Sequence, residues 1–116
     1  MIQGTFMVPH PPLIVPEVGR GEEQKIQDTI DAYHEVGRRI GGLQPETIVL
    51  LSPHQVMYAD YFHISPGNGA AGDLGQFGAG QVRFEVRYDR EFVENLCKLA
   101  DAGDLPAGTA GERERR

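Results

Sequence analysis

Three things are scarce in this sequence of 116 residues: cysteine, basic charge and long apolar runs. The single cysteine, Cys97, excludes an internal disulfide framework and a zinc site built from several cysteines. Lys and Arg number 11 against 17 Asp and Glu, and the resulting net charge of −6 argues against a nucleic-acid partner. The longest strictly aliphatic run, residues 48–51, cannot span a membrane, and the N-terminus lacks the basic region of a secretory signal. We therefore expect a soluble, cytoplasmic protein.

Glycine and proline, by contrast, are abundant, with 15 and 8 residues, and this excludes a long-helix or coiled-coil protein. Residues 66–80 alone contain six glycines, so we expect no regular element there. Ile, Leu, Val, Phe and Met make up about 28% of the chain, above the roughly 20% below which disorder is expected. The length fits one small domain with a core.

The first half of the chain predicts a strand, a helix and a second strand. Residues 2–8 are apolar and partly β-branched, and residues 47–51 form a continuous apolar run that suits a parallel strand covered on both faces. Between them, residues 22–40 have a helical period, with Gly41 and Gly42 as the predicted stop. The expected buried stripe consists of Ile26, Ile30, Tyr33, Gly37 and Ile40. This order predicts a βαβ unit, and hence an α/β fold with a mixed, largely parallel sheet flanked by helices.

The second half predicts two more strands and one helix. Residues 61–65 read as a short strand, and residues 81–88 alternate strictly between apolar and polar side chains, as in a strand with one wet face. Asp89 is a good N-cap for a helix over residues 90–102, which Gly103 closes. We expect Cys97 in the core and three further side chains of this helix pointing inward: Phe92, Leu96 and Leu99.

Two histidines directly follow the two predicted parallel strands. His10 comes after residues 2–8 and His54 after residues 47–51, each preceded by a proline. The carboxyl ends of neighbouring strands lie about 5 Å apart, and ligands of open α/β sheets bind outside those ends. Neutral imidazole is a suitable ligand for iron, zinc or copper. We predict that His10 and His54 share one metal ion; the alternative is that each is a loop histidine with local hydrogen bonds.

Other patterns are weaker. Residues 67–72 match G-x-G-x-x-G, but no helical pattern follows them, so we interpret them as a flexible loop and not as a dinucleotide site. Asp31, His34 and Glu35 share part of a helix surface, which favours a solvated face over a metal site. His63 lies in a predicted strand, where it lines a pocket or is half-buried. Ser52 has no G-x-S-x-G context and is not expected to be a nucleophile.

Three stretches resemble the class III extradiol ring-cleavage dioxygenases of the catalytic B-subunit type. They are residues 6–12 (Phe-Met-Val-Pro-His-Pro-Pro), residues 48–54 (Ile-Val-Leu-Leu-Ser-Pro-His) and residues 57–65. The resemblance extends to about residue 111 and is closest to the branch found with, or fused to, Memo-like and radical-SAM partner proteins. It implies an α/β fold and O₂-dependent ring cleavage of a catechol-type aromatic substrate, the function of an oxidoreductase.

The resemblance also implies a non-haem Fe(II) held by two histidines and one glutamate. By position, His10 and His54 match the two histidine ligands. A face of two histidines and one carboxylate leaves metal positions open for substrate and O₂. In the family, the carboxylate and the acid–base histidines lie far downstream in a longer chain. No carboxylate here matches it, since Glu112 belongs to a charged tail.

We therefore expect residues 1–111 to be the N-terminal portion of a domain that is truncated relative to the family, followed by a frayed tail over residues 112–116. The first hypothesis is a dioxygenase whose activity is low in this chain alone. The second is a Memo-like metal-binding or protein-interaction module, and the third is a non-catalytic remnant that pairs with another chain. Open strand edges predict an oligomer or association with a partner.

Overall fold

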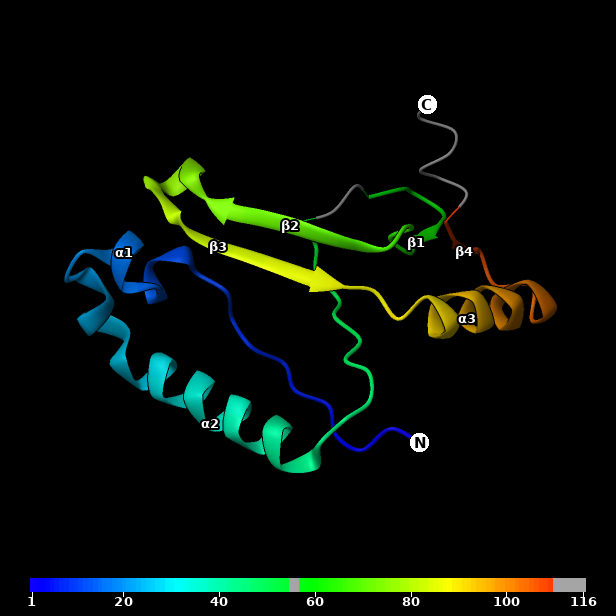
Figure 1. Cartoon of the computed structure of the whole chain (residues 1–116), viewed down its shortest axis with the longest axis horizontal. Coiled ribbons are helices and arrows are strands. Elements are labelled where there is room, and N and C mark those ends of the chain that lie inside the picture. The colour runs from blue at the N-terminus through cyan, green and yellow to red at the C-terminus, as the bar shows by residue number, and fades with distance from the viewer. Residues whose placement is uncertain (55–56, 110–116) are drawn as a thin grey trace. The chain divides into compact units, whose positions relative to one another are not determined.

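The computed structural model describes residues 1–54 and 57–109 (Figure 1). Within these ranges the protein has a mixed α/β fold, with three α-helices and two small sheets. The chain divides into two compact units. The first combines Met1–Ile48 with Gly72–Phe84, and the second combines Val49–Ala71 with Glu85–Arg116. No helix of the described ranges has both the length and the apolar character needed to cross a membrane.

The first unit is organised around α2, Gln27–Leu43. A 3-10 helix over Glu22–Ile26 leads into α2. Two short helices pack against this 3-10 helix and against each other: a 3-10 helix over Pro12–Ile14 and α1 over Pro16–Gly19. The predicted stripe is largely confirmed, because Ile26, Ile30, Tyr33 and Ile40 are half-buried, while Gly37 is exposed.

The predicted glycine stop of this helix is wrong. Helix α2 continues through Gly41 and Gly42 to Leu43, and its C-cap residue, Gln44, adopts a left-handed conformation (φ 48°). The N–H of Gln44 donates to the carbonyl of Gly41 at 3.2 Å, and this bond closes the last turn. A non-glycine residue thus supplies the left-handed cap that glycine more often provides.

The segment over residues 2–8 was predicted to be a strand, and this prediction is wrong. It has no regular secondary structure and runs along α2 in the opposite direction (Figure 1). A Cβ atom on Gly4 would lie 3.2 Å from Leu43 Cδ1, and the Tyr33 hydroxyl hydrogen-bonds to the carbonyl of Pro9. The backbone N–H and C=O groups of a helix are bonded within the helix, so a segment that packs on it finds no hydrogen-bond partners with which to form a strand.

The predicted parallel strand over residues 47–51 is also not formed in the described chain, and neither is the βαβ unit. The four aliphatic side chains of residues 48–51 are between 60% and 91% exposed. A strand covered on both faces needs neighbours on each side, and no described strand pairs with this run. The α/β class is therefore confirmed with different strands from those expected.

A hairpin of β2, Gly69–Leu74, and β3, Ala79–Arg87, provides one of the two sheets (Figure 1). A 3-10 helix over Gly75–Phe77 joins the strands. Strand β3 confirms the strand predicted over residues 81–88, but the prediction of one covered face is wrong, because Phe84 and Val86 on the apolar face are exposed. The expectation of no regular element over residues 66–80 is wrong. Strand β2 has one large apolar side chain, that of Leu74, and is defined by its backbone pairing with β3.

Gly69 shows why glycine suits β2. A Cβ atom at this position would lie 2.3 Å from the carbonyl oxygen of Val86, a distance that no side chain tolerates. Close backbone approach of this kind is one of the positional meanings of glycine in a strand.

The second unit contains α3, Arg90–Ala102, and the small parallel sheet of β1, Phe62–His63, and β4, Ala107–Gly108. Strand β1 confirms the core of the strand predicted over residues 61–65. The bounds of α3 and its cap are as predicted, since the Asp89 carboxylate accepts a hydrogen bond from the Phe92 N–H at 3.0 Å.

The inward face of α3 differs from the prediction. Phe92, Leu96 and Leu99 are exposed, and the more buried side chains are those one position further along the chain: Val93, Cys97 and Ala100. Strand β4 packs against α3, and the Leu105 N–H donates to the Ala100 carbonyl at 2.8 Å. This connection turns the small-residue face of the helix inward, so Cys97 is half-buried beside a buried Ala100.

Candidate functional site

His10 lies on an exposed loop of the first unit, between Pro9 and the 3-10 helix that begins at Pro12. The Tyr33 hydroxyl of α2 donates a hydrogen bond to the carbonyl of Pro9, which belongs to the peptide joining Pro9 to His10. Proline residues on both sides of His10 have fixed φ angles. The backbone that carries the imidazole is therefore restrained at several points.

This contact of Tyr33 was missed at the level of sequence. The helical period placed Tyr33 on the inward stripe, which the structure confirms. Its partner is a main-chain carbonyl, however, and every residue has one. The sequence signal that was available is only a tyrosine, rather than an aliphatic residue, in the middle of an apolar stripe.

His54 lies in an exposed turn of the second unit. Its backbone N–H donates to Ser52 Oγ at 3.2 Å, so Ser52 stabilises the turn that presents the histidine. Short turns of this type are a common use of serine.

The two candidate ligands belong to different units, His10 to the first and His54 to the second. Their convergence on one ion thus stays a prediction. Within residues 1–54 and 57–109, no group of three or more His, Cys, Asp or Glu side chains is placed to hold a metal ion. A centre with two histidines and one carboxylate is not complete in this part of the chain.

His63, in β1, is half-buried and stands opposite Gly108 of β4. Its ring lies 5.8 Å from that of Tyr58, and Tyr58 in turn makes an edge-to-face contact with Tyr61 at 6.1 Å. A Cβ atom on Gly108 would lie 2.7 Å from the Tyr61 hydroxyl, so this glycine makes room for the tyrosine. Tyr58, Tyr61 and the imidazole of His63 thus form an aromatic cluster within the second unit.

The polar residues on α2 have local partners. Asp31 accepts a hydrogen bond from Gln27 at 2.9 Å, and Glu35 forms ion pairs with Arg38 and Arg39. The hydrogen bond from Arg38, followed by that from Arg39, holds the pKa of the Glu35 carboxyl below its ordinary value. The interpretation of Asp31, His34 and Glu35 as a solvated helix face agrees with these contacts.

The G-x-G-x-x-G stretch at residues 67–72 does not open a helix. It runs into β2, and the first helix after it is the three-residue 3-10 turn at Gly75–Phe77. A dinucleotide site needs a helix N-terminus at this point, so its rejection is supported. The flexible loop predicted in its place is wrong, as described above.

Comparison with known proteins places these observations in a family. The sequence model of a family described as the catalytic LigB subunit of aromatic ring-opening dioxygenase matches residues 4–115. A curated protein of Clostridium acetobutylicum, Protein CA_C1420, is 34% identical over 106 residues, which are 91% of this chain and 23% of the relative. The chain thus spans less than a quarter of that relative's length. No solved structure matches the chain.

Proposed function

The chain belongs to the family of catalytic LigB subunits of aromatic ring-opening dioxygenases, and on that premise we propose that it supplies the two-histidine part of an iron centre for extradiol ring cleavage. His10 and His54 are the proposed ligands, Fe(II) the metal, and a catechol-type aromatic with O₂ the substrates. The observation that supports this most directly is the match over residues 4–115, which includes both histidines and their preceding prolines.

Local geometry supports these two residues as ligands. Each imidazole is carried on an exposed loop whose backbone is held by a hydrogen bond, from Tyr33 to Pro9 in one case and from the His54 N–H to Ser52 in the other. Ligands on restrained loops lose less conformational entropy when they bind a metal ion. Neutral imidazole nitrogen is a suitable donor for iron.

The donor set among the described residues does not by itself fit a complete iron centre, because no third ligand joins the two histidines there. The proposal therefore places the carboxylate in polypeptide outside residues 1–54 and 57–109. The curated relative, of which this chain covers 23%, is long enough to contain such a segment. We expect metal binding by this chain with little ring cleavage of its own.

Metal affinity of single-histidine variants tests the proposal. The protein is titrated anaerobically with Fe(II), and separately with Co(II) as a spectroscopic probe, in competition with a chelator. His10→Ala and His54→Ala are each expected to weaken binding by about tenfold or more, since each removes one donor. His34→Ala is the matched control, because this exposed histidine of α2 lies outside the proposed pair.

A result in which neither His10→Ala nor His54→Ala changes the affinity would contradict the proposal. O₂ uptake with a catechol is measured on the same loaded samples. Fast turnover by this chain that persists in both variants would show that ring cleavage uses other residues.

A second candidate function is a metal-binding or protein-interaction module without dioxygenase activity. The exposed aliphatic side chains of residues 48–51 favour it, since isolated proteins rarely expose a continuous apolar patch. Under this alternative the loaded protein binds metal through His10 and His54 and never consumes O₂, even when the longer polypeptide is assayed. The first proposal predicts O₂ consumption in that longer form.

A further inference from the structure

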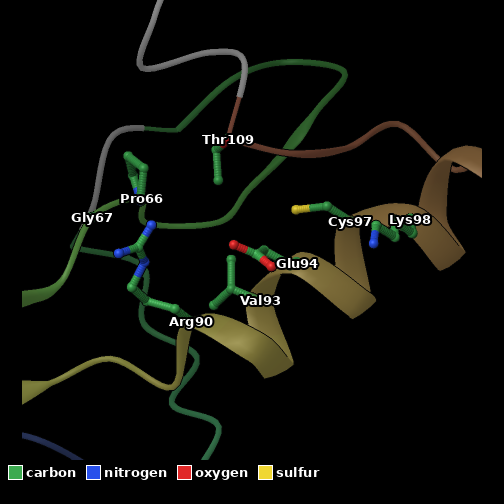
Figure 2. Close-up of a pocket in the computed structure, with 8 residues that line it drawn as sticks. All are labelled: Pro66, Gly67, Arg90, Val93, Glu94, Cys97, Lys98 and Thr109. Carbon is green, nitrogen blue, oxygen red and sulfur yellow. The ribbon is translucent and has the colours of Figure 1, made fainter.

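A pocket of about 330 Å³ lies in the second unit, on one side of α3 (Figure 2). Its walls come from α3, from the segment before β2 and from the residue after β4; the side chains that matter here are Pro66, Arg90, Val93, Glu94, Cys97 and Thr109. This volume is at the lower end of the range of small-molecule sites. Neither His10 nor His54 lines the pocket.

Two oppositely charged side chains of α3 line this pocket. Arg90 and Glu94 are one helical turn apart, and Figure 2 shows both side chains, with the sulfur of Cys97, projecting from α3 toward Pro66 and Thr109. In residues 1–54 and 57–109 the ion pairs formed are those of Glu22 and Glu35 with their neighbours on the same helices. The charged ends of Arg90 and Glu94 take part in none of the ion pairs or side-chain hydrogen bonds of this part of the chain.

These groups suit a ligand with two charges of opposite sign. A guanidinium recognises a carboxylate through paired N–H donors, and a carboxylate recognises an ammonium group. Lys98 also lines the pocket, one helical turn beyond Glu94 and two turns from Arg90. Val93, Pro66 and the Cys97 thiol give the remaining wall an apolar character, and Thr109 completes the wall after β4.

We propose that this pocket binds a small zwitterionic amino acid with an apolar side chain. The Arg90 guanidinium holds the carboxylate, the Glu94 carboxylate holds the ammonium group, and the side chain lies against Val93, Pro66 and Cys97. The inference is independent of the proposed iron centre, since it uses none of the candidate metal ligands.

The cysteine of the pocket reports on its occupancy. Cys97 is the one cysteine of the sequence, so alkylation by the uncharged reagent iodoacetamide measures access to the pocket. If L-leucine binds with a Kd of about 1 mM, then about 10 mM ligand slows alkylation about tenfold, a factor set by the fraction of pockets left empty. 4-Methylpentanoate, which is L-leucine without its ammonium group, and isopentylamine, which is L-leucine without its carboxylate, are expected to protect much less.

Two variants and a control decide the result. Arg90→Gln and Glu94→Gln are each expected to abolish the protection by L-leucine, whereas Arg87→Gln, an exposed arginine of β3 outside the pocket, retains it. The rate without ligand shows for each variant that the pocket still surrounds Cys97. The proposal is overturned if L-leucine gives no protection, if both variants are still protected, or if either single-charge analogue protects as well as L-leucine.

Discussion

Helices α2 and α3 are both amphipathic, yet the face with the largest apolar side chains is half-buried on α2 and exposed on α3. On α2 the predicted stripe is half-buried, and the segment over residues 2–9 runs along the helix. On α3 the larger side chains, Phe92, Leu96 and Leu99, are exposed, and β4 covers a face of smaller residues. The difference shows that an apolar period identifies a helix but does not determine which of its faces is buried. The buried face is the one against which a later or earlier element of the chain packs.

The largest expected effect comes from placing the same charged residue at two neighbouring positions of α3, one buried and one exposed. Ala100→Asp places a charge at a position that is 5% exposed, and we expect it to destabilise the protein by about 3 kcal/mol. Leu99→Asp, at a position that is 70% exposed, is expected to cost less than about 0.5 kcal/mol. Urea unfolding followed by circular dichroism measures both. A larger loss for Leu99→Asp would mean that the predicted face of α3 is the covered one after all.

The two helices also begin differently. The Asp89 side chain caps α3, whereas α2 has Ile26 at its N-cap position and no side-chain cap. Asp89→Ala is expected to destabilise the protein by about 1 kcal/mol through the loss of the bond to the Phe92 N–H. Asp28→Ala, in the first turn of α2, is the control and is expected to cost only a few tenths of that amount. Equal losses in the two variants would argue against the cap.

Removing one hydroxyl tests the contact between α2 and the segment before His10. Tyr33→Phe leaves the Pro9 carbonyl without its donor, and we expect a loss of about 1 kcal/mol, with faster amide exchange around residues 6–10. Tyr88→Phe removes a matched hydroxyl contact, with Ser65 at 2.9 Å in the second unit. Exchange around residues 6–10 should be unchanged in this control. Unchanged exchange in Tyr33→Phe would show that the contact does not restrain the loop.

The smallest effect concerns the exposed face of α2. Because Arg38 and Arg39 lower the pKa of Glu35 from 4.5 in the folded protein, Glu35 stabilises the fold above that pH. This contribution is lost as the pH falls through the lower, folded-state pKa. Wild type is thus expected to be slightly more stable than Glu35→Gln at pH 7, with the difference vanishing in acid and at high salt. A difference that grows in acid would contradict the assignment.

The sequence was sufficient for the elements whose signal is local. The helical period of α2, the position of strand β3 and the Asp89 cap of α3 are all confirmed, because each depends on residues within one element. The strands predicted over residues 2–8 and 47–51 failed for the opposite reason. Their composition fits a strand, but a strand forms only when another supplies its hydrogen bonds.

The same limit applies to the candidate sites. His10 and His54 were found through their matching prolines and their resemblance to a family, and the family is now established. The pocket that Arg90 and Glu94 line was missed, because residues 66 and 109 complete its wall from distant parts of the sequence. Strand β2 was missed because its pairing depends on backbone approach at Gly69, which composition alone cannot reveal.

The aliphatic run over residues 48–51 affects the tendency of the chain to aggregate before it has folded. Residues 47–52 form an uncharged six-residue segment without proline or glycine, and such a segment favours cross-β stacking between molecules when it is exposed. Pro45 and Glu46 stand on one side of the run and Pro53 on the other. Residues of this kind act as gatekeepers, because a proline cannot join a fibril ladder and a carboxylate repels its stacked copies. Replacing Pro53 would therefore endanger solubility during synthesis even if the finished fold were unchanged.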